Sequence, residues 1–161
     1  MRRVYLARGV VLLLAVSLKA QVLLLPPSVV RHGASGTLLL TLQSPPGKAP
    51  LALQWEITFP QNVAVDLEDM VAGSAAQSAE KLLTCRAFEK TKEAAEGSVY
   101  GCILAGGEKP IPNGPVAIVR YRVPSEIRQI SGKVRVGKAL GVTADIKKIE
   151  IEGVQAAIVV K

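Results

Sequence analysis

Apolar and polar residues alternate with a period of two along most of this chain from position 22 onward, and turn-forming residues interrupt the alternation at short intervals. The clearest segment is 51–59, where every second residue is a large apolar one. Such alternation is typical of a strand in an antiparallel sheet with one face in the core and the other in water. The predicted inner side chains of this segment are Leu51, Leu53, Trp55, Ile57 and Phe59, and the outer ones are Ala52, Gln54, Glu56 and Thr58.

The same pattern predicts about nine short strands and no long helix. Residues 68–80 are rich in Ala and Ser and are predicted to form a long connection with one helical turn. Many short strands separated by turns favour an all-β fold, an antiparallel β-sandwich of jelly-roll type. The predicted strands are 22–30 (interrupted by Pro26 and Pro27), 37–42, 51–59, 63–67, 82–88, 98–105, 116–123, 130–136, 147–152 and 154–160.

Two of these strands are predicted to pair as a hairpin around the polar loop 89–97. If strands 82–88 and 98–105 are symmetric about that loop, Cys85 lies nearly opposite Cys102. In an oxidising compartment such a pair favours one disulfide, which stabilises by roughly 3 kcal/mol in the chain-entropy model. Two free buried thiols are the alternative.

The N-terminal residues have the three-part pattern of a secretory signal. A basic opening with three arginines precedes the apolar run 9–18, and small residues follow it. This run is shorter than the roughly 20 apolar residues that span a bilayer. We therefore predict a signal peptide at 1–20, cleaved after Ala20, and one mature domain at 21–161 that is secreted to an extracellular or periplasmic location, with no membrane span after cleavage. Cleavage after Ser17, or a buried first element in place of a signal, are the alternatives.

Removal of the signal changes the electrostatic balance of the chain. The whole sequence has 20 Lys+Arg and 13 Asp+Glu, a net charge of +7. Residues 1–20 hold four of the basic residues and no acidic one, so that 16 basic and 13 acidic residues remain, a net charge of +3. The remaining charges are interspersed along the sequence, as on an ordinary solvated surface. Because they form no basic cluster, we predict that nucleic acid is not a partner.

No residue set with the chemistry of catalysis or metal binding is recognisable in the sequence. The single histidine, His32, lies in a turn near Ser35 without a carboxylate close by in sequence. Asp66, Glu68 and Asp69 cluster but lack the rhythm of a calcium loop. Two lone cysteines and one histidine do not make a metal-ligand set. We therefore predict that the protein is not an enzyme, with no catalytic residue, no metal and no cofactor.

Aromatic side chains are candidates for stacking against sugars, and most of them are predicted to lie in the core. By strand parity, Trp55, Phe59 and Tyr121 share the aliphatic faces of their strands. Phe88 and Tyr100 remain candidates for an exposed ring. The sequence therefore shows no aromatic strip of the kind that would hold a polysaccharide.

The order of several segments carries a family resemblance. The turn 33–37 opens a β run, segment 53–60 is a strand that ends at a proline corner, and 63–65 follows as a short apolar strand. Residues 114–123 are similar to a Gly-x-Leu-(small)-x-(aliphatic)-x-Phe-x-Val strand, and 152–160 to a closing Asn-Gly-x-Ile-x-Val. On these segments the chain resembles a cohesin domain, the β-sandwich receptor module of bacterial polysaccharide-degrading complexes.

The resemblance implies a binding role linked to extracellular polysaccharide degradation. The implied partner is a dockerin-like protein module, and the implied docking face is the sheet with strands 51–59, 82–88, 98–105 and 130–136. Two alternatives stay open: a carbohydrate-binding module that binds a polysaccharide directly, and a self-associating structural or adhesive surface domain. The implied partner-binding residues are Gln54, Glu56, Thr58, Lys133 and Arg135.

Overall fold

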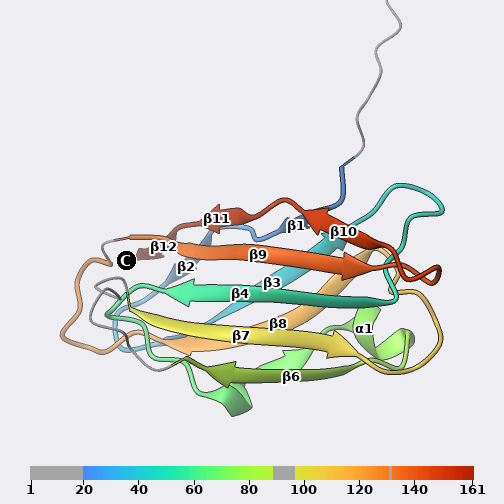
Figure 1. Cartoon of the computed structure of the whole chain (residues 1–161). Helices are drawn as coiled ribbons and strands as arrows, with labels where there is room; N and C mark the ends of the chain where they lie inside the picture. The colour runs from blue at the N-terminus through green and yellow to red at the C-terminus, as the bar shows by residue number, and fades with distance from the viewer. Residues whose placement is uncertain (1–19, 89–96, 131) are drawn as a thin grey trace, which may run out of the picture.

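Two antiparallel sheets packed face to face make up most of the fold (Figure 1). The computed structural model describes residues 20–88, 97–130 and 132–161. The six-stranded sheet has the order β10 (Lys148–Ile151), β9 (Val134–Val142), β4 (Ala52–Phe59), β7 (Ser98–Ala105) and β6 (Leu82–Ala87), with β11 (Val154–Ala156) beside β9. The four-stranded sheet has the order β1 (Val22–Leu24), β3 (Ser35–Gln43), β8 (Gly114–Arg122) and β5 (Met70–Ala72).

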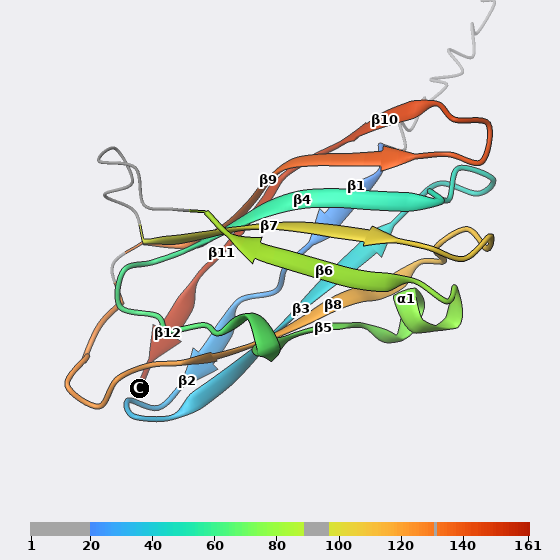
Figure 2. The same cartoon turned by 60° about the horizontal axis from the view of Figure 1, so that its bottom comes forward.

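The inner faces of the two sheets enclose one apolar core, and Figure 2 shows the two layers from a second direction. Large apolar side chains occupy alternate positions of each strand, so that one face leaves water while the other stays in contact with it. Four side chains of β4 are at most 3% exposed and three of β3 at most 1%. These are Leu53, Trp55, Ile57 and Phe59 on β4, and Leu38, Leu40 and Leu42 on β3.

The predicted all-β antiparallel sandwich is confirmed, with twelve strands in the described residues where the sequence predicts about nine. The predicted segments 37–42, 51–59, 82–88, 98–105 and 116–123 are all present, with ends displaced by two residues or fewer. The last predicted strand, 154–160, is divided at Ala157 into β11 and β12 (Ile158–Val160).

The predicted strand 22–30 is two strands in different sheets. β1 pairs with β3, whereas β2 (Ser28–Val30) pairs in parallel with β12 as a separate two-stranded sheet. Pro26 and Pro27 stand between them. Because proline has no N–H to donate to a ladder, the pair ends one strand and lets the chain turn towards the other.

The predicted strand 63–67 is wrong in its extent. Only an isolated bridge joins Ala64 to Arg122, and a 3₁₀ helix follows at Leu67–Asp69 before β5. Acidic residues are unfavourable in strands, which fits the end of extended structure at Asp66. The predicted helical turn within 68–80 is present as α1 (Ser74–Ser78).

The predicted strand 130–136 lies too early in the sequence, because β9 begins at Val134 and continues to Val142. The register between β4 and β9 shifts between Gln54 and Glu56, and Lys138 opposite this point has a φ of 48°. This is a β-bulge, in which one strand contains an extra residue. An extra residue breaks the period of two, so alternation alone could not predict that the strand continues beyond it.

The predicted signal peptide lies outside the described residues for positions 1–19. Of the first described residues, Ala20 is exposed and Gln21 is 5% exposed, with its backbone oxygen accepting a hydrogen bond from the Glu152 N–H at 3.3 Å. In the part of the chain that the structure describes, no helix has the length and apolar character needed to cross a membrane.

Candidate functional site

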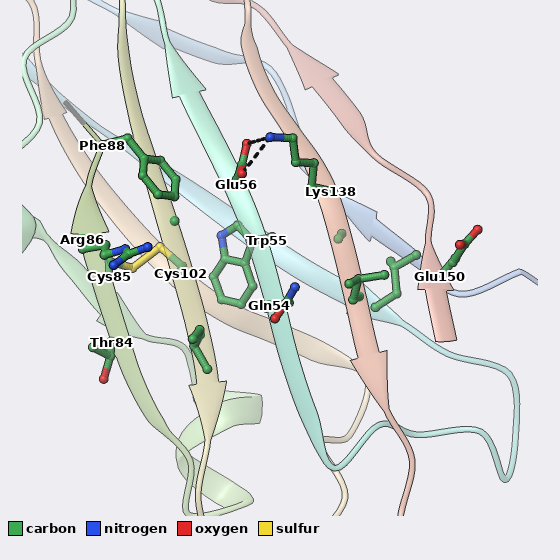
Figure 3. Close-up of a pocket in the computed structure, with 15 residues that line it drawn as sticks. Gln54, Trp55, Glu56, Thr84, Cys85, Arg86, Phe88, Cys102, Lys138 and Glu150 are labelled. Carbon is green, nitrogen blue, oxygen red and sulfur yellow. Dashed lines mark hydrogen bonds and ion pairs between the residues drawn. A yellow bond between two sulfur atoms is a disulfide. The ribbon is translucent and has the colours of Figure 1, made fainter. Parts of the chain in front are cut away.

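The outer face of the six-stranded sheet contains a shallow depression of about 690 Å³ over its central strands (Figure 3). β4 presents Gln54 and Glu56 to this face because Trp55 between them is turned into the core and is 3% exposed. The neighbouring strands supply the rest of the lining by the same alternation. The side chains that line the depression include Gln54, Glu56, Arg86, Phe88, Ile103 and Lys138.

Glu56 and Lys138 form an ion pair across the bulge between β4 and β9. The Lys138 Nζ lies 3.0 Å from Oε2 of Glu56 and also donates to its Oε1 at 3.0 Å. The Lys138 side chain is 77% exposed and that of Glu56 29%. Pairs this accessible stabilise a fold by only about 0.2–1 kcal/mol. The pair therefore matters more for holding two charges at a defined place on the face than for stability.

Phe88 lies flat against the sheet at Gly101. A β-carbon at position 101 would lie 2.7 Å from Cζ of Phe88, so the close contact requires glycine. The guanidinium carbon of Arg86 is 5.3 Å from the centre of the same ring, a cation–π distance. Phe88 remains 37% exposed. The face thus carries one aromatic ring that packs on Gly101 and remains partly open to a partner (Figure 3).

The disulfide lies behind this aromatic contact. Cys85 and Cys102 are directly opposite in the β6–β7 ladder, with a Cα–Cα distance of 4.1 Å, and they are joined as predicted. Cys102 is 3% exposed, so the bond faces the core side of the sheet. β6 is an edge strand with β7 as its ladder partner. The covalent bond therefore holds the strand from which Arg86 and Phe88 project.

Basic side chains outnumber acidic ones on the outer face. Glu56 and Glu150 are its acidic residues within the strands, and Lys133 is exposed directly before β9. The basic residues of the strands are Arg86, Arg135, Lys138 and Lys148.

Among the described residues, the aromatic side chains other than Phe88 are buried. Trp55, Phe59 and Tyr121 are at most 3% exposed, as predicted. Tyr100 is also buried, which corrects its place among the candidates for an exposed ring: its hydroxyl donates to the Val65 carbonyl at 2.6 Å, and burial raises the pKa of that hydroxyl. Its ring meets Phe59 edge to face at 6.0 Å. Tyr100 is a core residue because the chain offers its hydroxyl a partner inside.

The residues considered for catalysis or metal binding lie apart from the depression. His32 is exposed in the turn before β3, and Asp66, Glu68 and Asp69 surround the 3₁₀ helix at the surface. Within the described ranges, no group of three or more His, Cys, Asp or Glu side chains is placed to hold a metal ion.

Comparison with known proteins finds similarity at the level of structure alone, since the sequence matches no family model and no curated protein. A non-cellulosomal cohesin from the archaeon Archaeoglobus fulgidus matches with a TM-score of 0.64 at 13% identity, over 87% of this chain and 91% of that one. In a cohesin–dockerin complex from Clostridium thermocellum, the matched chain gives 0.64 at 11% identity, with 87% and 99% covered. The sixth cohesin of Acetivibrio cellulolyticus scaffoldin B, solved with a dockerin, gives 0.67 at 12% identity, with 88% and 99% covered. The domain has a cohesin-like fold.

This cohesin-like domain brings only some of the five predicted binding residues to the depression. Gln54 and Glu56 line it. Thr58 and Arg135 are direct partners in the β4–β9 register and line a smaller hollow beside it. Lys133 lies directly before the start of β9 and does not line the depression. The sheet predicted as the docking face is nevertheless one continuous sheet that contains β4, β6, β7 and β9.

Several side chains of the depression, Arg86, Ile103 and Lys138 among them, are absent from the predicted binding residues, and Phe88 is predicted only as a candidate for an exposed ring. Strand parity in 82–88 is sufficient to turn Arg86 and Phe88 to the outer face, because Cys85 and Ala87 pair with the inward Cys102 and Tyr100. No pattern in the sequence indicated Lys138, because this residue and the bulge beside it lie beyond the predicted strand 130–136.

Proposed function

We propose that this cohesin-like domain is a secreted, non-catalytic receptor module that binds a dockerin-type protein module through the outer face of its six-stranded sheet, in a system that degrades extracellular polysaccharides. The observation that carries the proposal is the preformed contact of Phe88 on Gly101, beside the Glu56–Lys138 pair. Binding energy at protein interfaces is concentrated in a few residues, often aromatic ones and Arg, that fit closely against a partner. The disulfide fixes β6 to β7, so the backbone that carries Arg86 and leads to Phe88 would lose little freedom on binding.

The structural neighbours support the choice of partner class. The Clostridium thermocellum and Acetivibrio cellulolyticus structures are cohesins bound to dockerins. At 11% and 12% identity they support the architecture, and a dockerin partner for this chain is our inference.

Calorimetry with a panel of purified dockerins tests the proposal. The protein is residues 21–161, and the variants are Phe88→Ala and the double substitution of Glu56 and Arg135 by alanine. We expect at least one dockerin to bind, with a loss of about 10-fold or more on truncation of Phe88. The matched control is Leu39→Ala, because Leu39 is 41% exposed and lies on β3 of the other sheet. Absence of binding by the whole panel, or an equal loss with the control, would contradict the proposal.

Direct binding of a polysaccharide is the second candidate, favoured by the exposed ring of Phe88. Trp55 cannot stack against a sugar from its buried position. Retention on insoluble cellulose, xylan and chitin, lost in Phe88→Ala, would favour this candidate over a dockerin. Light scattering of the same sample separates both from self-association through the exposed Leu82 and Ile103, which would give a mass that rises with protein concentration.

A further inference from the structure

β6 forms one edge of the six-stranded sheet, and it lacks the features that protect most edge strands (Figure 1). Natural edge strands are very short, carry proline or lysine, or contain a bulge, because their unpaired backbone groups otherwise pair with another chain. β6 has six residues without proline or lysine, and its register with β7 is unbroken from Leu82 to Ala87. Among the described strands, every other strand at the edge of a sheet has at most four residues. β6 is therefore the long open edge of the fold.

The hydrogen bonds at the two ends of β6 show which of its backbone groups face this open edge. The Phe88 N–H donates to the Val99 carbonyl at 2.9 Å, so the even-numbered residues of β6 turn their backbone groups towards β7. Lys81 has the opposite parity, and its N–H points away from β7, to the Ala76 carbonyl at 2.9 Å. Three residues of β6 share the parity of Lys81, and in the part of the chain that the structure describes no strand pairs with their N–H and C=O groups. These residues are Leu83, Cys85 and Ala87.

The same parity divides the side chains of β6 between the two faces of the sheet. Leu82, Thr84 and Arg86 lie on the outer face and are exposed. Leu83 and Cys85 lie between them and are half-buried. The disulfide to β7 holds the strand in place, so the edge is a fixed template. A strand that extends the sheet here needs the same alternation, and β6 of a second copy of the chain has it.

The side chains of β6 select one register for pairing with a second copy. In an antiparallel pair centred on Cys85, Leu82 lies opposite Phe88 of the second copy, and Thr84 lies opposite Arg86. Edge-facing residues then pair with edge-facing residues, and all of 82–88 is used. Centring the pair on Arg86 would instead place two guanidinium groups opposite each other, which is destabilising. Centring it on Thr84 would place Leu82 opposite Arg86 and leave Phe88 without an apolar neighbour.

We propose that β6 is a homodimer interface, through which two copies of this domain pair antiparallel about a two-fold axis at Cys85 and join their six-stranded sheets into one. The match of Leu82 with Phe88 and of Thr84 with Arg86 is self-complementary, which favours a second copy over an unrelated strand. The inference goes beyond the proposed function, because the contact is at the edge of the sheet and leaves the outer face uncovered. Both outer faces point to the same side of the joined sheet, so the dimer presents two binding faces to a partner with repeated modules.

Sedimentation velocity of oxidised residues 21–161, from about 10 µM to about 1 mM, tests the dimer. We expect a monomer–dimer equilibrium without larger species, because a two-fold pair uses the β6 edge of both copies. Ala87→Pro removes an edge-facing N–H that takes no part in the β6–β7 ladder, so one hydrogen bond is lost from each copy. The dimer should weaken about 10-fold or more. Circular dichroism melting checks that the variant retains its fold.

Charge at position 84 tests the register. Thr84→Glu places a carboxylate opposite Arg86 of the second copy, twice in the dimer, and should tighten it roughly 2- to 30-fold. Thr84→Lys should weaken it by a similar factor. The matched control is Ile103→Glu, because Ile103 is opposite Thr84 on β7, faces the same side and lies one strand further from the second copy. This control should change the dimer constant less than about 2-fold.

Three results would overturn the inference. One is a protein that stays monomeric at about 1 mM. Another is association that Ile103→Glu abolishes and Ala87→Pro leaves unchanged, since the copies would then meet through their outer faces. The third is weakening by Thr84→Glu as large as that by Thr84→Lys, which would exclude the pair centred on Cys85. Dockerin binding is measured separately, so loss of the dimer leaves the proposed function standing.

Discussion

At the scale of single residues, two glycines determine where aromatic rings lie in this protein. Gly101 admits the Phe88 ring to the outer face, and Gly36 admits the Tyr121 ring to the core, where a β-carbon on Gly36 would overlap the ring. The two rings have different freedom. Phe88 is partly exposed and could move aside, whereas Tyr121 is 2% exposed and its hydroxyl donates to the Ser28 hydroxyl at 2.7 Å.

This difference predicts the effect of Gly36→Ala on stability. The Tyr121 ring has no room to move, and overpacking a filled core costs typically about 1–3 kcal/mol. We expect urea denaturation to show a loss of unfolding free energy in this range. The matched control is Gly137→Ala, because a β-carbon at position 137 has no atom within 4 Å. A Gly36→Ala variant as stable as this control would contradict the packing described for Tyr121.

At the scale of elements, regular alternation was sufficient to predict β4, but it failed where the backbone departs from a regular strand. Leu53, Trp55 and Ile57 are buried as the pattern requires. Because of the bulge at Lys138, the prediction missed the second half of β9. It therefore also missed Lys138, one half of the ion pair in the candidate site. A bulge depends on the register with a neighbouring strand, which the sequence of one strand does not contain.

The hairpin of β6 and β7 could be predicted because two independent patterns agreed. Strand parity and the symmetric position of the cysteines about the loop both place Cys85 opposite Cys102, and the structure joins them. By contrast, the burial of Tyr100 on the same hairpin was not predicted, because the acceptor for its hydroxyl, the Val65 carbonyl, belongs to a distant segment.

Reduction of this disulfide should loosen β6 before the rest of the sheet. The bond closes a segment with a sequence separation of 17, and its loss costs roughly 3 kcal/mol in the chain-entropy model. β6 is at the edge of the sheet, whereas β4 is hydrogen-bonded on both sides. We expect hydrogen exchange to accelerate more in the amides of β6 than in those of β4, both after reduction and in Cys85→Ala/Cys102→Ala. Equal acceleration in the two strands would show that the bond stabilises only the fold as a whole.

At the scale of the whole molecule, the charge of the chain has two separate origins. Four basic residues belong to 1–20, and the outer face of the six-stranded sheet has four basic and two acidic residues within its strands. The total charge alone would indicate a polyanion partner, whereas removal of 1–20 would leave a net charge of only +3, which does not indicate one. Which interpretation applies depends on whether residues 1–20 are counted in the net charge.

Export of the full chain therefore gives a decisive measurement. In a bacterial host with an oxidising periplasm, we expect the protein to be processed after Ala20, so that Gln21 is its first residue. In the described fold Ala20 is exposed and Gln21 is buried next to β1, so this cut would leave the fold intact. The intact mass of the exported protein identifies the cut, and processing after Ser17 instead would leave three additional residues. The matched control is 21–161 expressed without the segment, which should remain in the cytoplasm with Cys85 and Cys102 reduced. An exported protein that keeps the mass of all 161 residues would contradict a cleaved signal.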